Sequence, residues 1–298
     1  MHGASSSVCP PRSESERGQG VDSANSDARV DLAAYAARVG AAGPLEASLE
    51  TLRALHRLHP VAIPFENLTT LLGESPLLDV PSLERKLVLS GRGGYCFEHN
   101  RLFGAVLESL GFAVTGLAAR VLWEREPGAV IPRTHMLLAV DVDGERYIAD
   151  VGFGGLTLTA PLRLVPNREQ PTPHETFRLR RHDGGFVLEA RLRDEWRALY
   201  WFDETIHLPI DFEVLNHFVA THPGSPFRSM LYCARVLPDR RLALRNGRFT
   251  VRRLGGAAET HELRGVAALR RVLGNDFGIA LPDEPMLDEI LEQVLTAW

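Results

Sequence analysis

The sequence MLLAVDVDGERYIADV (residues 136–151) holds two apolar, β-branched runs on either side of Asp143-Gly144. Asp-Gly between two such runs is typical of a two-residue turn that joins antiparallel strands. With these two residues in the turn, Leu137 pairs with Asp150. The stretch therefore predicts a hairpin, and with it an antiparallel sheet in the middle of the chain.

The hairpin also predicts that a histidine and a carboxylate lie together. His135 is two residues from Leu137, so it shares a face with Asp150 and is its diagonal neighbour, at a Cα separation of about 7–8 Å. A turn slipped by one residue would send one of the two side chains to the opposite face. A histidine oriented by a carboxylate is a common way to activate a nucleophile.

A candidate nucleophile lies upstream, in the segment RGGYCFEHN (residues 92–100). Residues 97–110 carry apolar side chains at helical spacing, and Gly111 is placed to end that helix. Cys96 should therefore lie at a helix N-terminus, where unpaired amides and the helix dipole favour a thiolate. Together with the His–Asp pair, this predicts a cysteine nucleophile for an acyl carbon.

Five segments of the chain resemble the signature segments of the arylamine N-acetyltransferases. They are IPFENL (63–68), RGGYCFEHN (92–100), RTH (133–135), DVGFGG (150–155) and THPGSPF (221–227). The resemblance runs from about Leu32 to near the C-terminus. It implies an α+β fold with an N-terminal helical bundle, a middle antiparallel β-barrel and a C-terminal α/β lid, around a cysteine-protease-like catalytic core. It also implies acetylation of arylamines or arylhydrazines by acetyl-CoA in a ping-pong cycle through an acetyl-cysteine.

The same resemblance assigns roles to individual residues. The implied catalytic residues are Cys96, His135 and Asp150. The implied contacts to coenzyme A are Gly152, Gly154, Gly155, Thr221 and Ser225, and the implied walls of the acceptor pocket are Phe65, Phe153 and Phe227. From the residues alone, other interpretations stay open: the phenylalanines could be core aromatics, the glycines a tight turn, and Thr221 and Ser225 capping residues.

Several further residues are expected to have no chemical role. Glu66 and Arg92 resemble structural partners, and a pair between them could hold the helical bundle to the cysteine loop. Cys96 and His99 have plausible metal-ligand spacing, but no second Cys/His pair lies nearby, so we expect no metal. Cys9 and Cys233 are expected to be non-catalytic.

Composition limits the cell compartment and the partners. The 298 residues include 38 acidic and 33 basic ones, a net charge of −5, which gives no reason to expect binding to nucleic acid or anionic membranes. The three cysteines give no disulfide framework, and no apolar run is long enough to span a bilayer. We therefore expect a cytoplasmic protein. The resemblance implies that its partners are acyl-CoA and small aromatic amines or hydrazines, and we expect a monomer or homodimer.

The expected organisation has five parts. They are a disordered extension (1–29), which has no signal-peptide pattern; a helical domain with the nucleophile (30–111); a β-barrel domain with His135 and Asp150 (112–205); a linking helix (206–223); and an α/β lid (224–298). Within them, helices are predicted at 30–39, 45–59, 81–89, 209–220, 265–273 and 284–297. Besides the hairpin, strands are predicted at 114–123, 176–180, 185–190, 228–236, 240–244 and 248–254. Pro44 fits the first turn of the second helix.

Three other functions share parts of this pattern. Amide synthases use the same fold and triad to close polyketide macrolactams from a carrier-bound donor. Cysteine hydrolases of the transglutaminase or papain-like kind share the Cys, His, Asp order. A binding protein could retain the fold after losing catalysis.

Overall fold

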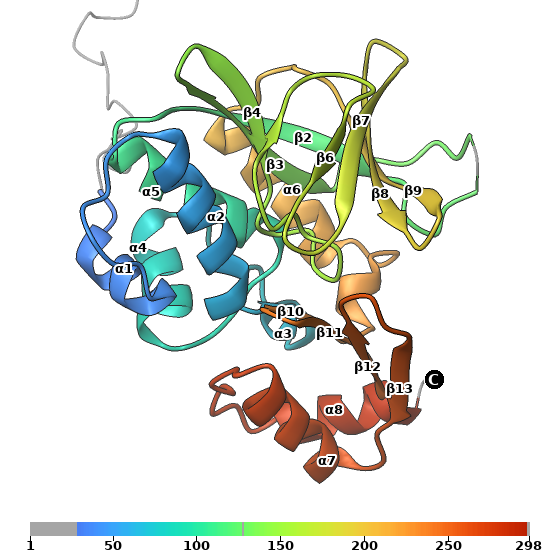
Figure 1. Cartoon of the computed structure of the whole chain (residues 1–298). Coiled ribbons are helices and arrows are strands. Elements are labelled where there is room, and N and C mark those ends of the chain that lie inside the picture. Colours follow the sequence, from blue (N-terminus) through green and yellow to red (C-terminus); the bar gives the residue numbers. More distant parts are fainter. Residues whose placement is uncertain (1–28, 127, 297–298) are drawn as a thin grey trace, which may run out of the picture.

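The computed structural model describes residues 29–126 and 128–296, so nearly all of the expected extension, with Cys9, lies outside the described residues. A helical region, a barrel and a lid follow one another along the chain (Figure 1). The helical region contains α1 (Leu32–Val39), α2 (Leu49–Ala62), β1 (Phe65–Glu66), α3 (Leu68–Leu71), α4 (Val80–Leu83) with a π-helical continuation (Glu84–Leu89), and α5 (Cys96–Ser109).

The start of α2 shows how a cap determines a helix boundary. The prediction of a helix from residue 45, with Pro44 in its first turn, was wrong. Helix α2 begins at Leu49 because the Ser48 side chain accepts a hydrogen bond from the Thr51 amide, which would otherwise be unpaired. The helix then continues through Pro60, beyond its predicted end.

The hairpin forms as predicted. Asp143 and Gly144 have φ values of 53° and 72°, as a type I′ turn requires, and Val142 pairs with Glu145. Its strands belong to one antiparallel sheet with the order β5-β4-β3-β2-β9-β8-β7-β6. The strands are β2 (Ala113–Val121), β3 (His135–Val142), β4 (Glu145–Ala149), β5 (Leu162–Arg163), β6 (Glu169–Pro171), β7 (Thr176–His182), β8 (Gly185–Leu192) and β9 (Glu195–Phe202).

This sheet nearly closes on itself. Its end strands β5 and β6 are joined by side-chain contacts, in which the Arg163 amide donates to the Gln170 side chain and the Gln170 side chain donates back to the Arg163 carbonyl. The interior is filled by apolar side chains from all the long strands. Strand β9, which sequence reasoning did not separate from its surroundings, pairs with both β2 and β8 and so closes the middle of the sheet.

The linking helix α6 (Pro209–Thr221) leads to a second sheet with the order β1-β10-β11-β12-β13. The prediction of a strand from residue 228 was wrong at its start, because Pro226–Arg228 forms a 3₁₀ turn first. The remaining elements are β10 (Tyr232–Leu237), β11 (Arg240–Arg245), β12 (Arg248–Arg253), β13 (Ala258–Glu262), α7 (Val266–Arg271) with a π-helical continuation (Val272–Asp276), and α8 (Leu287–Thr296).

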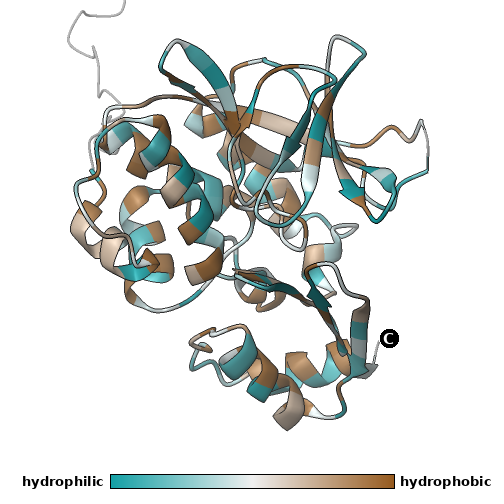
Figure 2. Ribbon diagram, viewed as in Figure 1, coloured by the Kyte–Doolittle hydropathy of each residue, from teal (hydrophilic) through white to brown (hydrophobic). Residues whose placement is uncertain are grey.

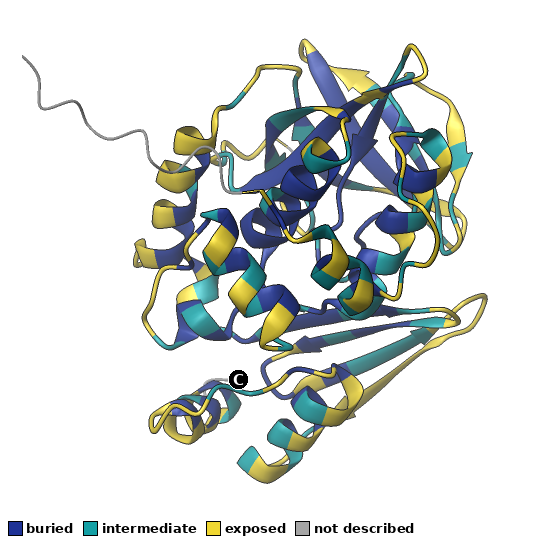
Figure 3. Ribbon diagram, turned by 90° about the vertical axis from the view of Figure 1, so that its left-hand side faces the viewer, coloured by how far each residue is buried: buried dark blue, intermediate teal, exposed yellow. Residues whose placement is uncertain are grey.

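Three apolar cores hold these parts together. One lies among the helices and reaches the outer face of β3, one fills the barrel, and one lies between the second sheet and its helices. Apolar and polar residues accordingly alternate around the helices (Figure 2), and buried residues concentrate in the barrel strands and α5 (Figure 3). The predicted α+β fold is confirmed. No helix among the described residues is long and apolar enough to cross a membrane.

Candidate active site

Cys96 is the first residue of α5, as predicted, and is only 5% exposed. The loop before it is tightly packed: a Cβ atom at Gly93 would lie 2.1 Å from the Pro64 carbonyl oxygen, so no other residue fits. The Glu98 carboxylate accepts a hydrogen bond from the Tyr95 amide, 3.0 Å away, and fixes the helix start. The thiol therefore occupies a rigid, electropositive position.

The histidine and the aspartate of the hairpin meet as predicted. His135 Nε2 and Asp150 Oδ2 are 2.8 Å apart, and both side chains are buried. Because Nε2 is occupied by Asp150, Nδ1 is the nitrogen left for the thiol, and the neighbouring Cys96 helps to raise the pKa of His135. The Cys96 thiol in turn donates to the Thr134 carbonyl oxygen, 3.7 Å away.

Asp150 is held from three sides. Its Oδ1 accepts from the Asn100 side-chain amide and from the Gly152 backbone amide, each at 3.0 Å, and its own amide donates to His56 Nε2. Burial favours the neutral acid, but the charge of His135 and these hydrogen bonds outweigh it and lower the pKa of Asp150. The carboxylate is therefore ionised at neutral pH.

His135 is the counterpart of this charge. Burial disfavours its cationic form, yet the charge and the hydrogen bond of Asp150, together with the neighbouring Cys96, raise the pKa of His135 above its ordinary value. A histidine that readily holds a proton stabilises a neighbouring thiolate. His135 is therefore suited to act as the base beside Cys96.

Two of the three predicted phenylalanines lie together. Phe65 and Phe227 have ring centroids 6.3 Å apart, and Phe227 also contacts the ring of Tyr95, beside the nucleophile. Phe153 lies apart from them, against the His135 ring at 5.1 Å. Phe153 therefore contacts the triad directly, whereas Phe65 and Phe227 form an aromatic pair beside Tyr95 of the cysteine loop.

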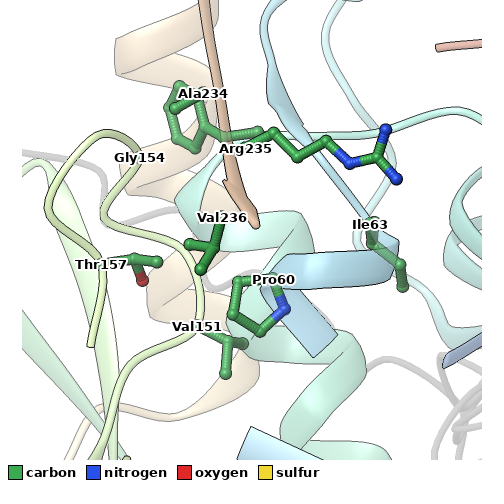
Figure 4. A pocket seen from close by; sticks show the side chains of 9 residues that line it. Pro60, Ile63, Val151, Gly154, Thr157, Ala234, Arg235 and Val236 are labelled. Atoms are coloured by element: carbon green, nitrogen blue, oxygen red, sulfur yellow. The ribbon is translucent and has the colours of Figure 1, made fainter. Parts of the chain in front are cut away.

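A narrow cleft opens where the helical region, the barrel and the lid meet (Figure 4). Of the predicted site residues, Phe65 and Gly154 line it. A Cβ atom at Gly154 would lie 3.6 Å from the Phe65 ring, and the φ of Gly154 is 79°, so this loop packs closely on the aromatic wall. The other lining residues are Pro60, Ile63, Val151, Thr157, Ala234, Arg235 and Val236.

The remaining residues assigned to coenzyme A have varied surroundings. Gly152 packs against the first turn of α5, whereas Gly155 lies opposite Ala243 of the second sheet. Thr221 is exposed at the end of α6 and donates its hydroxyl hydrogen to the His217 carbonyl. Ser225 is buried at the start of the 3₁₀ turn. Their contact with coenzyme A remains a prediction.

Three side chains around the triad were not expected. Asn100, one turn after Cys96, bonds to Asp150 and also donates to the Met136 carbonyl. His56 receives the Asp150 amide from 94 residues away. The Tyr200 ring packs 4.9 Å from His135, with its hydroxyl buried beside Asp150 without a hydrogen bond of ordinary geometry. Only Asn100 had a usable signal, its place on the same helical face as Cys96.

The side chains expected to be structural are indeed packed within the protein. Arg92 donates to Glu66 at 2.9 Å, which ties β1 to the cysteine loop as expected. Cys233 is buried in β10, and burial raises the pKa of its thiol well above the usual value. Within residues 29–126 and 128–296, no group of three His, Cys, Asp or Glu side chains is arranged to hold a metal ion.

Comparison with known proteins gives the family of this fold and site. A sequence model described as N-acetyltransferase matches residues 48–286. An arylamine N-acetyltransferase of Escherichia coli is 44% identical over 250 residues, which cover 84% of this chain and 89% of the relative. The chain belongs to the arylamine N-acetyltransferase family. It is therefore an acyltransferase.

Two further family members extend the comparison. An arylamine N-acetyltransferase of Mycobacterium tuberculosis is 43% identical over 274 residues, or 88% of this chain and 96% of the relative. The solved structure of the Mycobacterium marinum arylamine N-acetyltransferase in complex with CoA matches with a TM-score of 0.85 and 41% identity. It covers 89% of this chain and 99% of its own. The family predicted from the sequence motifs is confirmed.

Proposed function

We propose that Cys96, His135 and Asp150 transfer an acetyl group from acetyl-CoA to an arylamine or arylhydrazine in a ping-pong cycle. The observation that carries this proposal is the arrangement of the three side chains. Asp150 orients His135 through a 2.8 Å contact, and His135 neighbours a cysteine at a helix start, in a chain of this family. The related structure with bound CoA supports the donor.

In the first half-reaction, His135 takes the proton of Cys96, and the thiolate attacks the acetyl carbonyl carbon of acetyl-CoA. The new bond joins Cys96 Sγ to that carbon, and the bond from the carbon to the CoA sulfur breaks. His135 returns its proton to the departing CoA thiolate. The Cys96 amide, in the first turn of α5, stabilises the oxyanion.

In the second half-reaction, the amine nitrogen attacks the acetyl-Cys96 thioester. Neutral His135 accepts the proton that the nitrogen loses, and the bond between Cys96 Sγ and the acetyl carbon breaks. The products are the acetylated amine and the starting pair of thiolate and protonated His135. Asp150 keeps the histidine in one orientation and tautomer throughout.

The acceptor and the donor enter between different walls. Phe65, Phe153 and Phe227 offer flat apolar surfaces, which suit an aryl ring. Gly154, next to Phe65 in the cleft, and its neighbours Gly152 and Gly155 let a ligand approach the backbone, and we assign them with Thr221 and Ser225 to the donor side.

We also propose that the enzyme works in the cytoplasm, as a monomer or homodimer that binds neither nucleic acid nor membranes. The net charge of −5 supports the absence of both polyanionic partners. Cys96 and Cys233 are free thiols, as a reducing compartment favours.

Steady-state kinetics with a panel of arylamines and arylhydrazines and with acetyl-CoA test the function. We expect parallel double-reciprocal lines when both substrates are varied. Without acceptor, each enzyme molecule should release one equivalent of CoA, and further release should require the acceptor. CoA release at the same rate without acceptor would instead indicate a thioester hydrolase. Converging lines would contradict the ping-pong cycle, and no use of acetyl-CoA would favour an amide synthase.

A further inference from the structure

A second set of buried histidines, His59 of α2 and His99 of α5, lies outside the triad. Tyr35 of α1 bonds through its hydroxyl to His59 Nδ1, at 2.9 Å. His59 Nε2 is 2.9 Å from His99 Nδ1, and His99 Nε2 is 3.2 Å from the Pro64 carbonyl oxygen. A continuous hydrogen-bonded chain therefore runs from α1, through α2 and α5, to the residue before Phe65.

The last acceptor determines the direction of the whole chain. A carbonyl oxygen can only accept, so His99 must donate from Nε2, and a neutral His99 then accepts at Nδ1. His59 must therefore donate from Nε2 and accept at Nδ1, which leaves the donor role to the Tyr35 hydroxyl. All hydrogen-bonding atoms of both imidazoles are satisfied in one arrangement only.

The surroundings keep the two imidazoles neutral. Both side chains are completely buried, and burial lowers the pKa of His99 to about 4 and that of His59 well below its ordinary value. Both imidazoles also contact aromatic rings: the Phe103 ring lies 5.5 Å from His59, and the Phe65 ring lies 6.3 Å from His99 and nearly parallel to it. Rotating either imidazole would break its hydrogen bonds, and the buried ring could not replace them with hydrogen bonds to water.

The chain ends at the wall of the proposed acceptor pocket. The Pro64 carbonyl that receives His99 precedes Phe65, and the Phe65 ring lies over the His99 ring. Phe65 is also held by strand pairing with Gly94 of the cysteine loop and with Ala234 of β10. His99 therefore contacts the pocket wall in two ways, through the backbone before it and through the ring itself.

From these contacts we infer that Tyr35, His59 and His99 are positioning residues that hold Phe65 in place for the aromatic acceptor. This inference rests on the proposed function. None of the three side chains bonds to His135 or Asp150 among the described residues, so they should govern the acceptor half-reaction and leave acetylation by acetyl-CoA unchanged. A residue with a merely structural role would impair both half-reactions together.

Tyr35→Phe is the most conservative test, because it removes one hydroxyl and leaves the ring. We expect discharge of acetyl-Cys96 by an arylamine to slow about threefold to tenfold, from the loss of one buried hydrogen bond, while acetylation changes by less than about twofold. Tyr147→Phe is the matched control: this tyrosine is also buried in the helical core, and its hydroxyl bonds to no described side chain. Equal slowing of both half-reactions by Tyr35→Phe would overturn the inference.

Two variants of His99 test the same positioning role if Tyr35→Phe does not fold. His99→Leu removes both polar contacts, whereas in His99→Gln an amide can still donate to the Pro64 carbonyl and accept from His59. We expect Gln to recover most of the acceptor rate that Leu loses. Equal loss in both variants would contradict a hydrogen-bonded positioning role.

Nitrogen-15 NMR of the histidines gives a readout that needs no substrate. We expect neutral Nε2–H tautomers for His59 and His99 at pH 7, and an Nδ1–H tautomer of His99 would overturn the chain. Acetylation of the wild-type protein distinguishes a failure of the proposed function from a failure of the inference. If the wild-type protein forms no acetyl-enzyme, the proposed function fails and the inference fails with it. If the wild-type protein is acetylated and discharged normally, and Tyr35→Phe discharges its acetyl group at the wild-type rate, the inference alone is refuted.

Discussion

Two buried histidines near the first turns of α5, His135 and His99, behave in opposite ways. His135 lies against the ionised Asp150, which raises its pKa, whereas His99 lies against neutral partners, and burial lowers its pKa to about 4. Both side chains are almost completely inaccessible to solvent. Burial therefore suppresses the charged form, and at His135 the direct contact of Nε2 with the Asp150 carboxylate outweighs it.

The largest expected effect removes that difference. Asp150→Asn should make His135 resemble His99, with a pKa below its ordinary value and no fixed tautomer. We expect the acetylation rate of Cys96 to fall about 10³- to 10⁴-fold, the scale found when a triad carboxylate is lost. Stopped-flow acetylation measures the rate, and NMR titration measures the pKa of His135.

Asp203→Asn is a suitable control for this variant. Asp203 is also paired, with Arg133 at 2.6 Å, but it is partly exposed and outside the triad. We expect it to change the acetylation rate by less than about threefold, since partly exposed ion pairs contribute little. Near-normal turnover of Asp150→Asn would show that the hairpin geometry does not activate the thiol.

The neutral histidines predict that acid destabilises the fold. In the unfolded chain they take up protons below about pH 6.5, but folded His56 and His99 resist protonation until about pH 4. Unfolding therefore binds protons in this range, so stability falls as the pH falls from 6.5 toward 4, by up to about 3 kcal/mol for each histidine. Urea unfolding at several pH values measures this slope.

His135 has the opposite sign. Its folded pKa is raised, so its stabilising contribution is complete below about pH 6.5 and is lost as the pH rises toward its folded pKa.

His99→Gln should flatten the slope of stability against pH between pH 6.5 and 4, because glutamine does not titrate. A wild-type unfolding free energy that is constant between pH 6.5 and 4.5 would contradict neutral buried histidines.

The smallest expected effect concerns the packing of Gly152 against the first turn of α5. A Cβ atom at Gly152 would lie 3.0 Å from the Cys96 Cα, the His99 Cβ and the Asn100 side-chain nitrogen. Gly152→Ala should therefore cost about 1–3 kcal/mol of stability through overpacking. It should also slow acetylation, because it displaces the helix start.

Gly104→Ala provides the matched comparison within α5. Its Cβ would meet the side chains of Leu138, at 3.6 Å, and Val114, at 3.9 Å, in ordinary van der Waals contact, so we expect a gain of about 0.5–1 kcal/mol from the lower entropy of the unfolded chain. Urea midpoints measure both substitutions. Equal midpoints for the two variants would mean that the contact between Gly152 and α5 is not tight.

The local parts of this site could be predicted from the sequence, and the long-range parts could not. The Asp143-Gly144 turn determines the strand register by itself, so it places His135 and Asp150 on one face. Residue spacing likewise places Cys96 at a helix start. The contact of His56 with Asp150 joins positions 94 residues apart, and no periodicity or turn signal carries such information.

The histidine chain shows the same limit. For His99, only metal binding was weighed from the sequence and no hydrogen-bond partner was named, and its partners lie on α2 and beside β1. The start of α2 was a different kind of error, because the prediction used Pro44 as the start signal and did not use the capping side chain of Ser48. In that case the decisive signal was present in the sequence.

The most direct measurement of the central claim is the intact mass of the protein after incubation with acetyl-CoA, followed by peptide mapping. We predict one added acetyl group, located on Cys96, absent from Cys96→Ala and removed on addition of an arylamine. Cys233, buried and with a raised pKa, serves as the internal control and should stay unmodified. An adduct that persists in Cys96→Ala, or no adduct on the wild-type protein, would contradict the account.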